Sequence, residues 1–504
     1  MKRTKSRSAK ESTRPAAASL SRRSFLLTAS GFAGAALVPS LVRASRIGDS
    51  GARPSSYDII VIGAGFAGLA AARQAVRQGA TVLVLEARGR VGGRTLNASL
   101  GGGKVVEVGG EWVGPGQTSI LALAAEVGVA TFKTYNTGNN LLYYQGKLAP
   151  YDSAGIPPIP DADSNEFLSV AFGVLDPLAA KIPLDTPWSA PGVDVQALDG
   201  QTVETWKLAQ LATPGARFFL DLLVEAVFAC EPRDVSLLDF LVSVHSSGGV
   251  LPLVTTDGGA QDSRLVGGSQ LVAQRVAAQL GDRVVLNAPV RRILQHPSFV
   301  TVETDARPYR AAQIIVTVPP ALCPRIDFDP PLPGLRDQLT QRFPQGSVIK
   351  CQAVYDSPFW RAAGLTGQVT SDTGPVKVTF DNSPPDGSPG VLVGFIEGDE
   401  ARAWGPRSAA DRRTAVLESF TRYFGAQAAA VKGYVEYAWS EDPWTRGCYG
   451  GYLPPGVLTN YGPAITAPIG RIHWAGSETA GPWNGYIDGA VSSGVRAVEE
   501  ITGK

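Results

Sequence analysis

The first strongly patterned part of the chain is an apolar, β-branched run at residues 57–62, of the kind that is buried in a parallel sheet. Small residues follow it, and apolar positions at helical spacing then extend to about residue 78. A second apolar run, at residues 81–85, ends at the acidic Glu86. This order predicts a strand, a turn, a helix and a second strand, which is how an α/β domain begins.

Later patterns divide the chain into two kinds of segment. Residues 132–262 combine proline-rich loops with helices expected at 215–227 and 235–244, whereas strand-like runs return from residue 263. We therefore predict an α/β fold in which a Rossmann-like cofactor domain is interleaved with a substrate domain of mixed sheet and helices. The expected cofactor domain comprises residues 57–131, 263–340 and 442–504, and the expected substrate domain comprises residues 132–262 and 341–441. Further strands of the cofactor domain are expected at 263–268, 284–290, 299–303, 313–318 and 471–475.

Glycines mark the turn between the first strand and the first helix, in Gly63-Ala64-Gly65-Phe66-Ala67-Gly68. Gly63 permits a tight turn, Gly65 lets backbone N–H groups approach a pyrophosphate, and Gly68 allows close packing of helix and strand. Glu86 is placed to accept a hydrogen bond from a ribose hydroxyl. The pattern predicts a dinucleotide site with contacts at Gly63, Gly65, Ala67, Gly68 and Glu86.

The first 44 residues predict an export signal rather than part of the fold. A basic stretch containing Arg22 and Arg23 precedes a weakly apolar run, residues 25–42, and a small-residue cleavage site at 42–44. This order resembles a twin-arginine signal and implies export of the folded protein to the periplasm or the medium. An N-terminal anchor and a disordered basic tail are the alternatives. Residues 45–56 are expected to be a linker.

Composition narrows the possible functions. Hydrophobic residues make up 44% of the 504 residues, which excludes a largely disordered chain. The 46 lysines and arginines nearly balance the 45 acidic residues, so a small molecule is expected as partner and nucleic acid is not. The four cysteines and three histidines are scattered, and no metal site is expected. No later run suits a membrane span, so no transmembrane anchor is expected in the mature form, and a homodimer is left open.

Residues 86–94 extend the glycine motif with three arginines and a pair of glycines. This extension resembles that of flavoproteins and is unlike ordinary NAD domains, so FAD is the expected cofactor. Residues 109–115 resemble the segment that passes the flavin ring in the flavin monoamine oxidases, with a plain glycine turn as the alternative. The resemblance implies cofactor contacts at Arg88, Gly93, Arg94, Gly110, Glu111 and the backbone of Val290.

Two pieces of the last third resemble the same family. Residues 346–351 match the segment whose lysine faces flavin N5 through a water, which implies that Lys350 assists the reaction with oxygen. Residues 439–456 match the stretch whose cysteine is joined to the flavin 8α-methyl group, so Cys448 is expected to bind FAD through a thioether and Trp439 to contact it. The alternatives are an exposed lysine and an inert core cysteine.

A third piece, residues 471–501, is the strongest local match. It implies that Glu478 contacts the ribityl or pyrophosphate part of FAD and that a helix starting near Gly485 points its positive end at the flavin. Tyr449 and Tyr486 match the pair of tyrosines that flanks the amine in front of the flavin. The alternatives are a helix N-terminal acid for Glu478 and ordinary packing for the tyrosines.

The resemblance covers residues 56–503 and implies the FAD fold shared by amine oxidases and glutathione reductase. It implies oxidative deamination of a primary amine to an aldehyde, ammonia and hydrogen peroxide, with hydride transfer to flavin N5 and dioxygen as acceptor. Lys350, Tyr449 and Tyr486 are the expected catalytic residues, and Val378 and Ser246 are expected at a rebuilt substrate cavity. An L-amino-acid oxidase, an amine dehydrogenase and a flavin-loaded binding protein without turnover remain alternatives.

Overall fold

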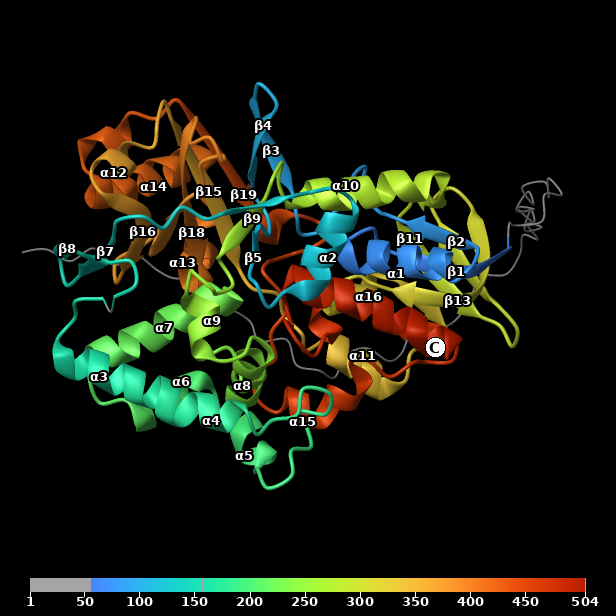
Figure 1. Cartoon of the computed structure of the whole chain (residues 1–504). Helices are drawn as coiled ribbons and strands as arrows, with labels where there is room; N and C mark the ends of the chain where they lie inside the picture. Colours follow the sequence, from blue (N-terminus) through green and yellow to red (C-terminus); the bar gives the residue numbers. More distant parts are fainter. Residues whose placement is uncertain (1–55, 156, 504) are drawn as a thin grey trace, which may run out of the picture. The chain divides into compact units, whose positions relative to one another are not determined.

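The computed structural model describes residues 56–155 and 157–503, which Figure 1 draws in colour. The predicted export signal, residues 1–44, and all of the predicted linker except Ser56 lie outside the described residues. Among the helices that are described, none is long and apolar enough to cross a membrane.

The glycine motif belongs to an eight-stranded sheet. In spatial order its strands are β10 (Val284–Val285), β2 (Val82–Leu85), β1 (Ser56–Ile62), β13 (Pro308–Val316), β12 (Val300–Thr304), β11 (Val290–Gln295) and β14 (Asp327–Asp329), and β20 (Ile472–Trp474) pairs with β13. The pairs that join β10, β2, β1, β13 and β20 are parallel, whereas β12 runs antiparallel to both of its neighbours. All of β2 is buried, as expected for a parallel strand that is covered on both faces.

Four helices cover one face of this sheet, as Figure 1 shows. They are α1 (Phe66–Arg77), α2 (Thr118–Glu126), α10 (Ser269–Leu280) and α16 (Ile487–Thr502). α1 and α16 pack closely, because Gly494 of α16 faces the backbone of α1 and a Cβ there would lie 2.1 Å from the carbonyl oxygen of Ala67. The first and last helices of the described chain are thereby held together.

Two strand predictions need correction. The expected strand 284–290 is divided into β10 and β11, because Asn287 adopts a left-handed conformation (φ 55°) and its N–H donates to the carbonyl of Arg88. The run 263–268 forms β9 (Ser263–Leu265), which pairs with β5 (Trp112–Val113) and β6 (Thr131–Lys133) in a separate sheet. In that position its Arg264 reaches the carboxylate of Glu107 at 2.6 Å.

A seven-stranded sheet forms the wall opposite the glycine motif. Its strands, in spatial order, are β19 (Gly433–Ala438), β15 (Val348–Tyr355), β18 (Gly390–Glu397), β17 (Val378–Asp381), β16 (Leu365–Ser371), β7 (Asn139–Tyr144) and β8 (Lys147–Asp152). β15 and β18 are buried over their whole length. The helices α12 (Phe359–Ala362), α13 (Gly398–Trp404) and α14 (Ala409–Phe424) contribute to the core on one face of this sheet. A hairpin of β3 (Asn97–Gly101) and β4 (Lys104–Glu107) forms a separate sheet that packs against β15 and β18.

Helices make up the rest of the predicted substrate domain. They are α3 (Asp161–Val170), α4 (Asp176–Ala179), α5 (Val195–Asp199), α6 (Val203–Gln210), α7 (Pro214–Phe228), α8 (Leu237–Ser246) and α9 (Val250–Val254), with α11 (Gly334–Thr340) and α15 (Val457–Tyr461) packed nearby. The two helices predicted here are confirmed as α7 and α8. Thr213 and Ser236 cap them by accepting hydrogen bonds from backbone N–H groups of the first turn. The domain boundaries themselves stay a prediction.

Candidate functional site

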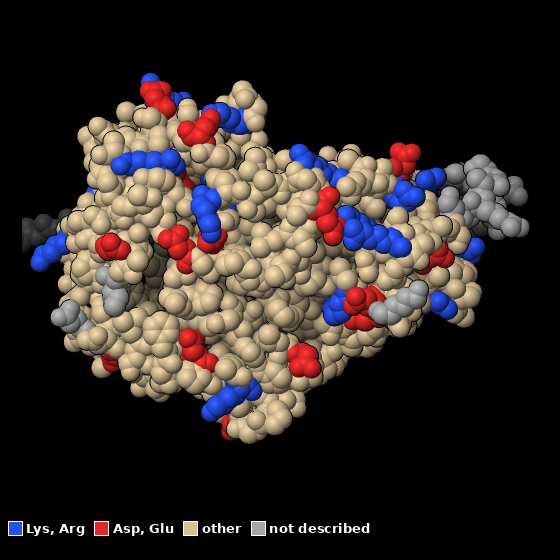
Figure 2. Space-filling model, viewed as in Figure 1, with Lys and Arg blue, Asp and Glu red and all other residues tan. Residues whose placement is uncertain are grey.

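A cavity of about 980 Å³ lies between the two large sheets and the helical segment. Its walls come from the ends of β1 and β2, from β15, β17 and β18, and from α7. Figure 2 shows the surface hollowed between β7, β16 and α7, all of which contribute residues to the wall. On the same face, basic and acidic side chains are interspersed and neither sign dominates.

One end of the cavity is built by the glycine motif. Gly63, Gly65 and Ala67 line it, whereas Gly68 packs behind it, where a Cβ would lie 2.0 Å from the carbonyl oxygen of Gly63. Glu86 also lines this end and accepts hydrogen bonds from the backbone N–H groups of Ala64 (2.7 Å) and Arg88 (2.9 Å). Other predicted cofactor contacts also line the cavity. They are Arg88, Gly93, Arg94, Gly110, Glu111 and Val290.

The residues at this end fit FAD. Two helices begin at the cavity, α1 after Gly65 and α16 after Tyr486, and neither has a side-chain cap on its first N–H groups. Uncapped helix N-termini attract phosphate groups and developing negative charge. Gly65 and Gly93 also leave a narrow channel between two backbones, since a Cβ on Gly93 would lie 3.2 Å from the Cα of Gly65.

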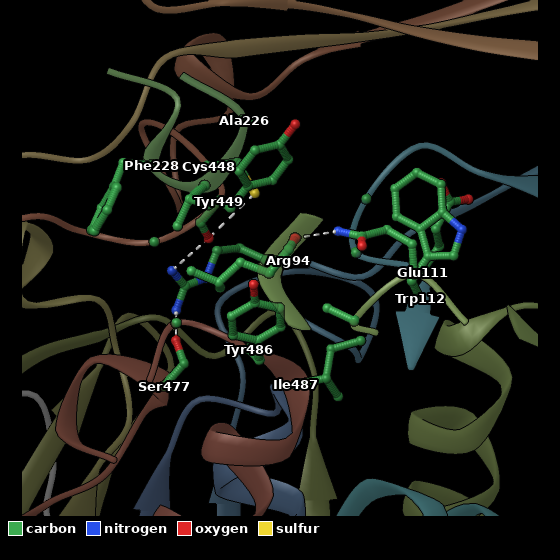
Figure 3. Close-up of a pocket in the computed structure, with 18 of the residues that line it drawn as sticks. Arg94, Glu111, Trp112, Ala226, Phe228, Cys448, Tyr449, Ser477, Tyr486 and Ile487 are labelled. Atoms are coloured by element: carbon green, nitrogen blue, oxygen red, sulfur yellow. Dashed lines mark hydrogen bonds between the residues drawn. The ribbon is translucent and has the colours of Figure 1, made fainter. Parts of the chain in front are cut away.

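A buried ion pair joins the segment after the glycine motif to the segment before α16. Arg94 donates to both carboxylate oxygens of Glu478, at 2.5 and 2.9 Å. Its guanidinium also donates to the carbonyl oxygen of Tyr449 and the hydroxyl of Ser477, each at 3.0 Å (Figure 3). Burial opposes ionisation of Glu478, but Arg94 outweighs it and lowers the pKa of Glu478 to about 2. The Glu478 carboxylate is held by Arg94, which itself lines the cavity, and the expected contact of Glu478 with FAD stays a prediction.

Lys350 lies inside the cavity wall, so the alternative of an exposed lysine is wrong. Its Nζ lies 2.7 Å from Oε1 of Glu111 and donates to the carbonyl oxygen of Gly109 at 2.9 Å. The rings of Trp112 and Phe395 flank it, with centroids at 5.2 and 5.5 Å. Burial lowers the pKa of Lys350, and the Glu111 carboxylate opposes that shift.

Cys448 and Tyr449 follow one another on the wall, and the peptide bond between them is cis. Cys448 is a free, buried thiol. Burial raises its pKa to about 12, with the charge of Arg94 acting in the opposite direction. The unliganded site therefore holds Cys448 as a thiol rather than a thiolate at neutral pH.

Tyr449 and Tyr486 enter the cavity from two different segments (Figure 3). The Tyr449 hydroxyl donates to Oε1 of Glu397 at 2.7 Å, and its ring meets Phe395 edge-on with centroids 6.2 Å apart. Tyr486 is the residue before α16, and its ring makes an edge contact with Trp483 at 5.1 Å. Burial raises the pKa of both phenols, so both stay uncharged at neutral pH.

Two other predicted contacts lie behind the wall. The Trp439 indole donates to the carbonyl oxygen of Val108 at 2.7 Å and packs in the cluster that contains Cys448, so it supports the wall without lining it. Ser246, expected at the substrate, accepts a hydrogen bond from the backbone N–H of Asn484 at 3.2 Å and so supports the loop that carries Tyr486. Val378 does line the cavity.

Glu397 lines the cavity and was not among the predicted site residues. It is the last residue of β18, and its side chain is buried. A signal for it exists in the sequence, because a glutamate ends the otherwise apolar run 391–396. A charged residue that closes a fully buried strand is uncommon and indicates a functional position.

Comparison with known proteins finds one family that matches almost all of the described chain. The profile described as flavin containing amine oxidoreductase matches residues 66–502. A putative flavin-containing monoamine oxidase, AofH of Mycobacterium tuberculosis, is 40% identical over 450 residues, covering 89% of this chain and 97% of that protein. The flavin-containing amine oxidase B of Sus scrofa is 37% identical over 451 residues, covering 89% and 86%.

Solved structures are similar over the same extent. A putrescine oxidase bound to putrescine superimposes with a TM-score of 0.86 at 35% identity, covering 89% of this chain and 100% of that one. The cyclohexylamine oxidase of Brevibacterium oxydans IH-35A gives a TM-score of 0.85 at 34% identity, covering 89% and 99%. The predicted FAD-dependent α/β fold is confirmed.

Replacement of Glu478 by glutamine is expected to destabilise the protein by about 3 kcal/mol, because it leaves the mostly buried Arg94 charge without a carboxylate partner. The pKa of Glu478 lies near 2 instead of 4.5, so its stabilisation is complete above about pH 4.5 and is lost as the pH falls toward 2. Denaturant midpoints of the FAD-loaded protein at pH 7 and pH 3.5 should therefore differ more for the wild type than for Glu478→Gln.

The control for this experiment is Glu126→Gln, which removes an exposed carboxylate paired with Arg73 and Arg77. Exposed pairs contribute only about 0–1 kcal/mol, so this variant should unfold almost as the wild type does. Equal losses for the two variants would contradict the importance assigned to the Arg94–Glu478 pair.

Proposed function

The chain belongs to the flavin-containing amine oxidoreductases and uses FAD to oxidise amines, and we propose that its substrate is a primary amine, converted to an aldehyde and ammonia with reduction of dioxygen to hydrogen peroxide. The observation that carries the proposal is that Tyr449, Tyr486 and Lys350 enter one cavity together with residues that fit FAD. When bound there, FAD takes two electrons from the amine and delivers them to dioxygen.

The two tyrosines are proposed to orient the amine. Their phenol rings are uncharged, and the negative faces of aromatic rings attract the polarised hydrogens around an amine nitrogen. The apolar wall beside them favours the neutral amine over the ammonium ion, because a charge is costly to bury without a partner. A neutral amine loses its α-hydrogen without a dedicated general base, and the phenols need not transfer protons.

Lys350 is proposed to assist the oxygen half of the reaction. Its ammonium group lies beside Glu111 at the flavin end of the cavity, between the rings of Trp112 and Phe395. A buried cation stabilises the negative charge that develops as dioxygen accepts electrons, and the effect is large where water is excluded.

The charged groups of the cavity favour an amine over an amino acid as substrate. An L-amino-acid oxidase needs a cation for the substrate carboxylate. The arginines that line this cavity in the described residues are Arg88, Arg94, Arg291 and Arg325. Arg94 is already paired with Glu478, and the group that lies beside Tyr449 is the carboxyl of Glu397. This placement supports a cationic or neutral nitrogen compound.

Similarity to solved structures does not identify which amine this chain oxidises. One solved relative is named for putrescine and another for cyclohexylamine, and their TM-scores of 0.86 and 0.85 are almost equal. The side chains that line the cavity of this chain must set the preference.

An amine panel tests the proposal. Anaerobic addition of primary aliphatic, aromatic and diamine compounds to the FAD-loaded protein is expected to bleach the flavin absorbance for at least one class. Admission of air should restore the absorbance rapidly and release hydrogen peroxide in equal amount. A panel in which no amine bleaches the flavin would refute the proposed function.

The second half of that experiment separates an oxidase from a dehydrogenase. Reduction by amine followed by slow reoxidation in air would indicate a dehydrogenase. The variant Lys350→Met should keep the reduction by amine and slow the reoxidation by about 100-fold, since it removes one preorganised charge from the site of oxygen reduction. An unchanged rate of reoxidation would remove Lys350 from the proposed mechanism.

We also propose that Cys448 forms a thioether with the 8α-carbon of FAD: the S–H bond of the thiol and one C–H bond of the methyl group would break, and the two electrons released would pass to the flavin and from it to dioxygen. The place of Cys448 on the cavity wall supports this, and a solved putrescine oxidase whose cofactor binding was redesigned carries an alanine-to-cysteine mutation. The wild-type polypeptide should keep its yellow colour and a mass increase matching FAD after denaturation, whereas Cys448→Ala should release free FAD. Because burial raises the pKa of Cys448 to about 12, attachment in apoprotein mixed with FAD should become faster as the pH rises. Loss of the colour from denatured wild type would refute the bond.

Export of the folded protein is proposed from residues 1–44. The arginine pair, the apolar run and the cleavage site support it. Replacement of Arg22 and Arg23 by lysine in the full chain should keep the FAD-containing protein in the cytoplasm of a bacterial host, as measured by cell fractionation. Equal export of the wild type and the variant would count against a twin-arginine signal.

A further inference from the structure

β18 ends at a carboxyl group inside the amine end of the cavity. In the antiparallel pairing of β15 with β18, Lys350 lies opposite Phe395, and Glu397 follows two residues later. Residues two apart on a strand point to the same face, at a spacing of about 7 Å. Lys350, Phe395 and Glu397 all line the cavity, which agrees with this alternation. Glu397 thus lies about 7 Å along the wall from the row that holds Lys350.

The Glu397 carboxyl has one fixed hydrogen-bond partner. The Tyr449 hydroxyl donates to its Oε1 at 2.7 Å, and only 6% of the residue surface is exposed. In the part of the chain that the structure describes, no lysine, arginine or histidine forms an ion pair with it. Burial raises the pKa of Glu397 to about 8, although the hydrogen bond from Tyr449 opposes the shift.

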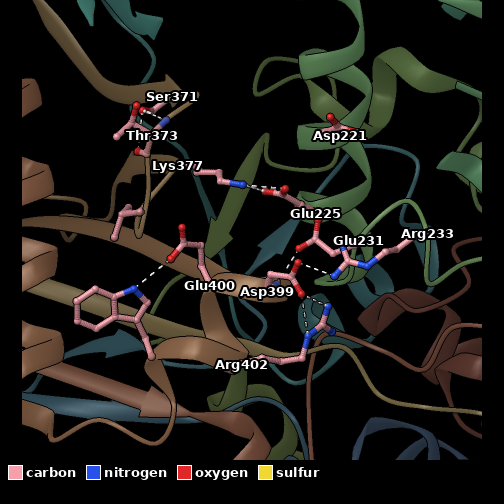
Figure 4. Close-up of polar contacts among 12 residues, drawn as sticks. Asp221, Glu225, Glu231, Arg233, Ser371, Thr373, Lys377, Asp399, Glu400 and Arg402 are labelled. Atoms are coloured by element: carbon pink, nitrogen blue, oxygen red, sulfur yellow. Dashed lines mark hydrogen bonds and ion pairs between the residues drawn. The ribbon is translucent and has the colours of Figure 1, made fainter. Parts of the chain in front are cut away.

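The charged groups around Glu397 do not compensate the negative charge of its carboxylate. The cation whose charge acts on Glu397 is Lys377, whose Nζ donates to both carboxylate oxygens of Glu225 at 2.8 Å, as Figure 4 shows. Glu225 comes from α7, and Glu231, which follows α7, accepts a hydrogen bond from the backbone N–H of Asp399 at 2.7 Å. Helix, loop and strand together therefore surround Glu397 with two carboxylates and one lysine that is already paired.

A purely structural role does not explain this arrangement. Tyr449 requires only a hydrogen-bond acceptor, which a glutamine supplies without charge. A buried carboxyl without a cation is costly, and such groups are usually kept where they bind a charged partner. The cavity that Glu397 faces admits amines, which are cations in water.

We propose that Glu397 binds a second cationic group of the substrate, so that the site prefers diamines whose far ammonium group reaches the Glu397 carboxylate. The inference rests on the proposed amine oxidation and adds the substrate class. The reacting nitrogen lies between Tyr449 and Tyr486, and the far ammonium donates to the free oxygen of Glu397. The Tyr449 hydrogen bond holds the carboxylate in place for that contact.

The test compares two amines of equal chain length, butane-1,4-diamine and n-butylamine. For the FAD-loaded wild type, kcat/KM should be at least about 10-fold higher for the diamine, with most of the difference in KM, because the second cation adds ground-state binding. Glu397→Gln keeps the acceptor for Tyr449 and the side-chain volume. It should lower kcat/KM for the diamine by about 10- to 100-fold and lower that for n-butylamine much less, so the ratio collapses.

The control variant is Glu400→Gln, which neutralises a nearby carboxylate that does not line the cavity and that accepts a hydrogen bond from Trp404 (Figure 4). It should keep the wild-type ratio. The ratio should also rise with pH toward about 8 in the wild type, because Glu397 ionises through that range, and should lose this rise in Glu397→Gln.

Three outcomes overturn the inference. The first is a wild type with equal kcat/KM for the two amines. The second is a Glu397→Gln variant in which kcat/KM falls by the same factor for both amines, which would mean that Glu397 acts on the reacting amine through Tyr449. The third is a Glu400→Gln variant that changes the ratio as much as Glu397→Gln does. The wild-type ratio decides alone if Glu397→Gln does not fold. Bleaching by n-butylamine without a preference for the diamine refutes only this inference, whereas absence of bleaching by every amine refutes the proposed function beneath it.

Discussion

The ion pair between Arg94 and Glu478 is the interaction on which the rest of the site depends. It ties the segment after the glycine motif to the segment before α16, and the same guanidinium holds the backbone of Tyr449 and the hydroxyl of Ser477. Glu478 is buried and the Arg94 side chain is 20% exposed, so the carboxylate requires the guanidinium as its partner. The Arg94–Glu478 ion pair thus positions three segments. They contribute to the cofactor end of the cavity, to the tyrosine pair and to α16.

Other buried charges around the cavity are likewise paired with an opposite charge. Lys350 lies against Glu111, Arg264 against Glu107, and Lys377 against Glu225. In these contacts each charge is balanced by its partner before any ligand binds. Glu397 departs from this pattern, since its fixed partner is the neutral phenol of Tyr449.

The cavity is consequently divided by charge. At one end, two uncapped helix N-termini favour the phosphates and the electron-accepting ring of FAD. At the other end, aromatic rings and the Glu397 carboxyl favour a nitrogen cation or amine. The eight-stranded sheet and its helices supply the first end, and the seven-stranded sheet supplies most of the second. The division of the chain into two interleaved sheets thus separates binding of the oxidant from binding of the reductant.

The sequence by itself determined the first βαβ unit, the glycine motif with Glu86, the FAD expectation and the family, because these depend on short segments whose spacing fixes the local backbone. Residue types within motifs also indicated Lys350, Tyr449 and Tyr486, and the structure brings all three to one cavity. The local pattern was not sufficient to predict which distant part of the chain each motif contacts.

Only the tertiary structure decided which groups meet across the fold. It placed Ser246 under the Tyr486 loop, divided the strand expected at 284–290 at Asn287, and gave Glu478 to Arg94, a partner 384 residues away in the sequence. It also brought Glu397 to the hydroxyl of Tyr449. Such contacts depend on how two sheets and a helical segment pack together. A pattern of hydrophobic positions specifies which face of an element is buried, but it does not specify which distant polar group that face will meet.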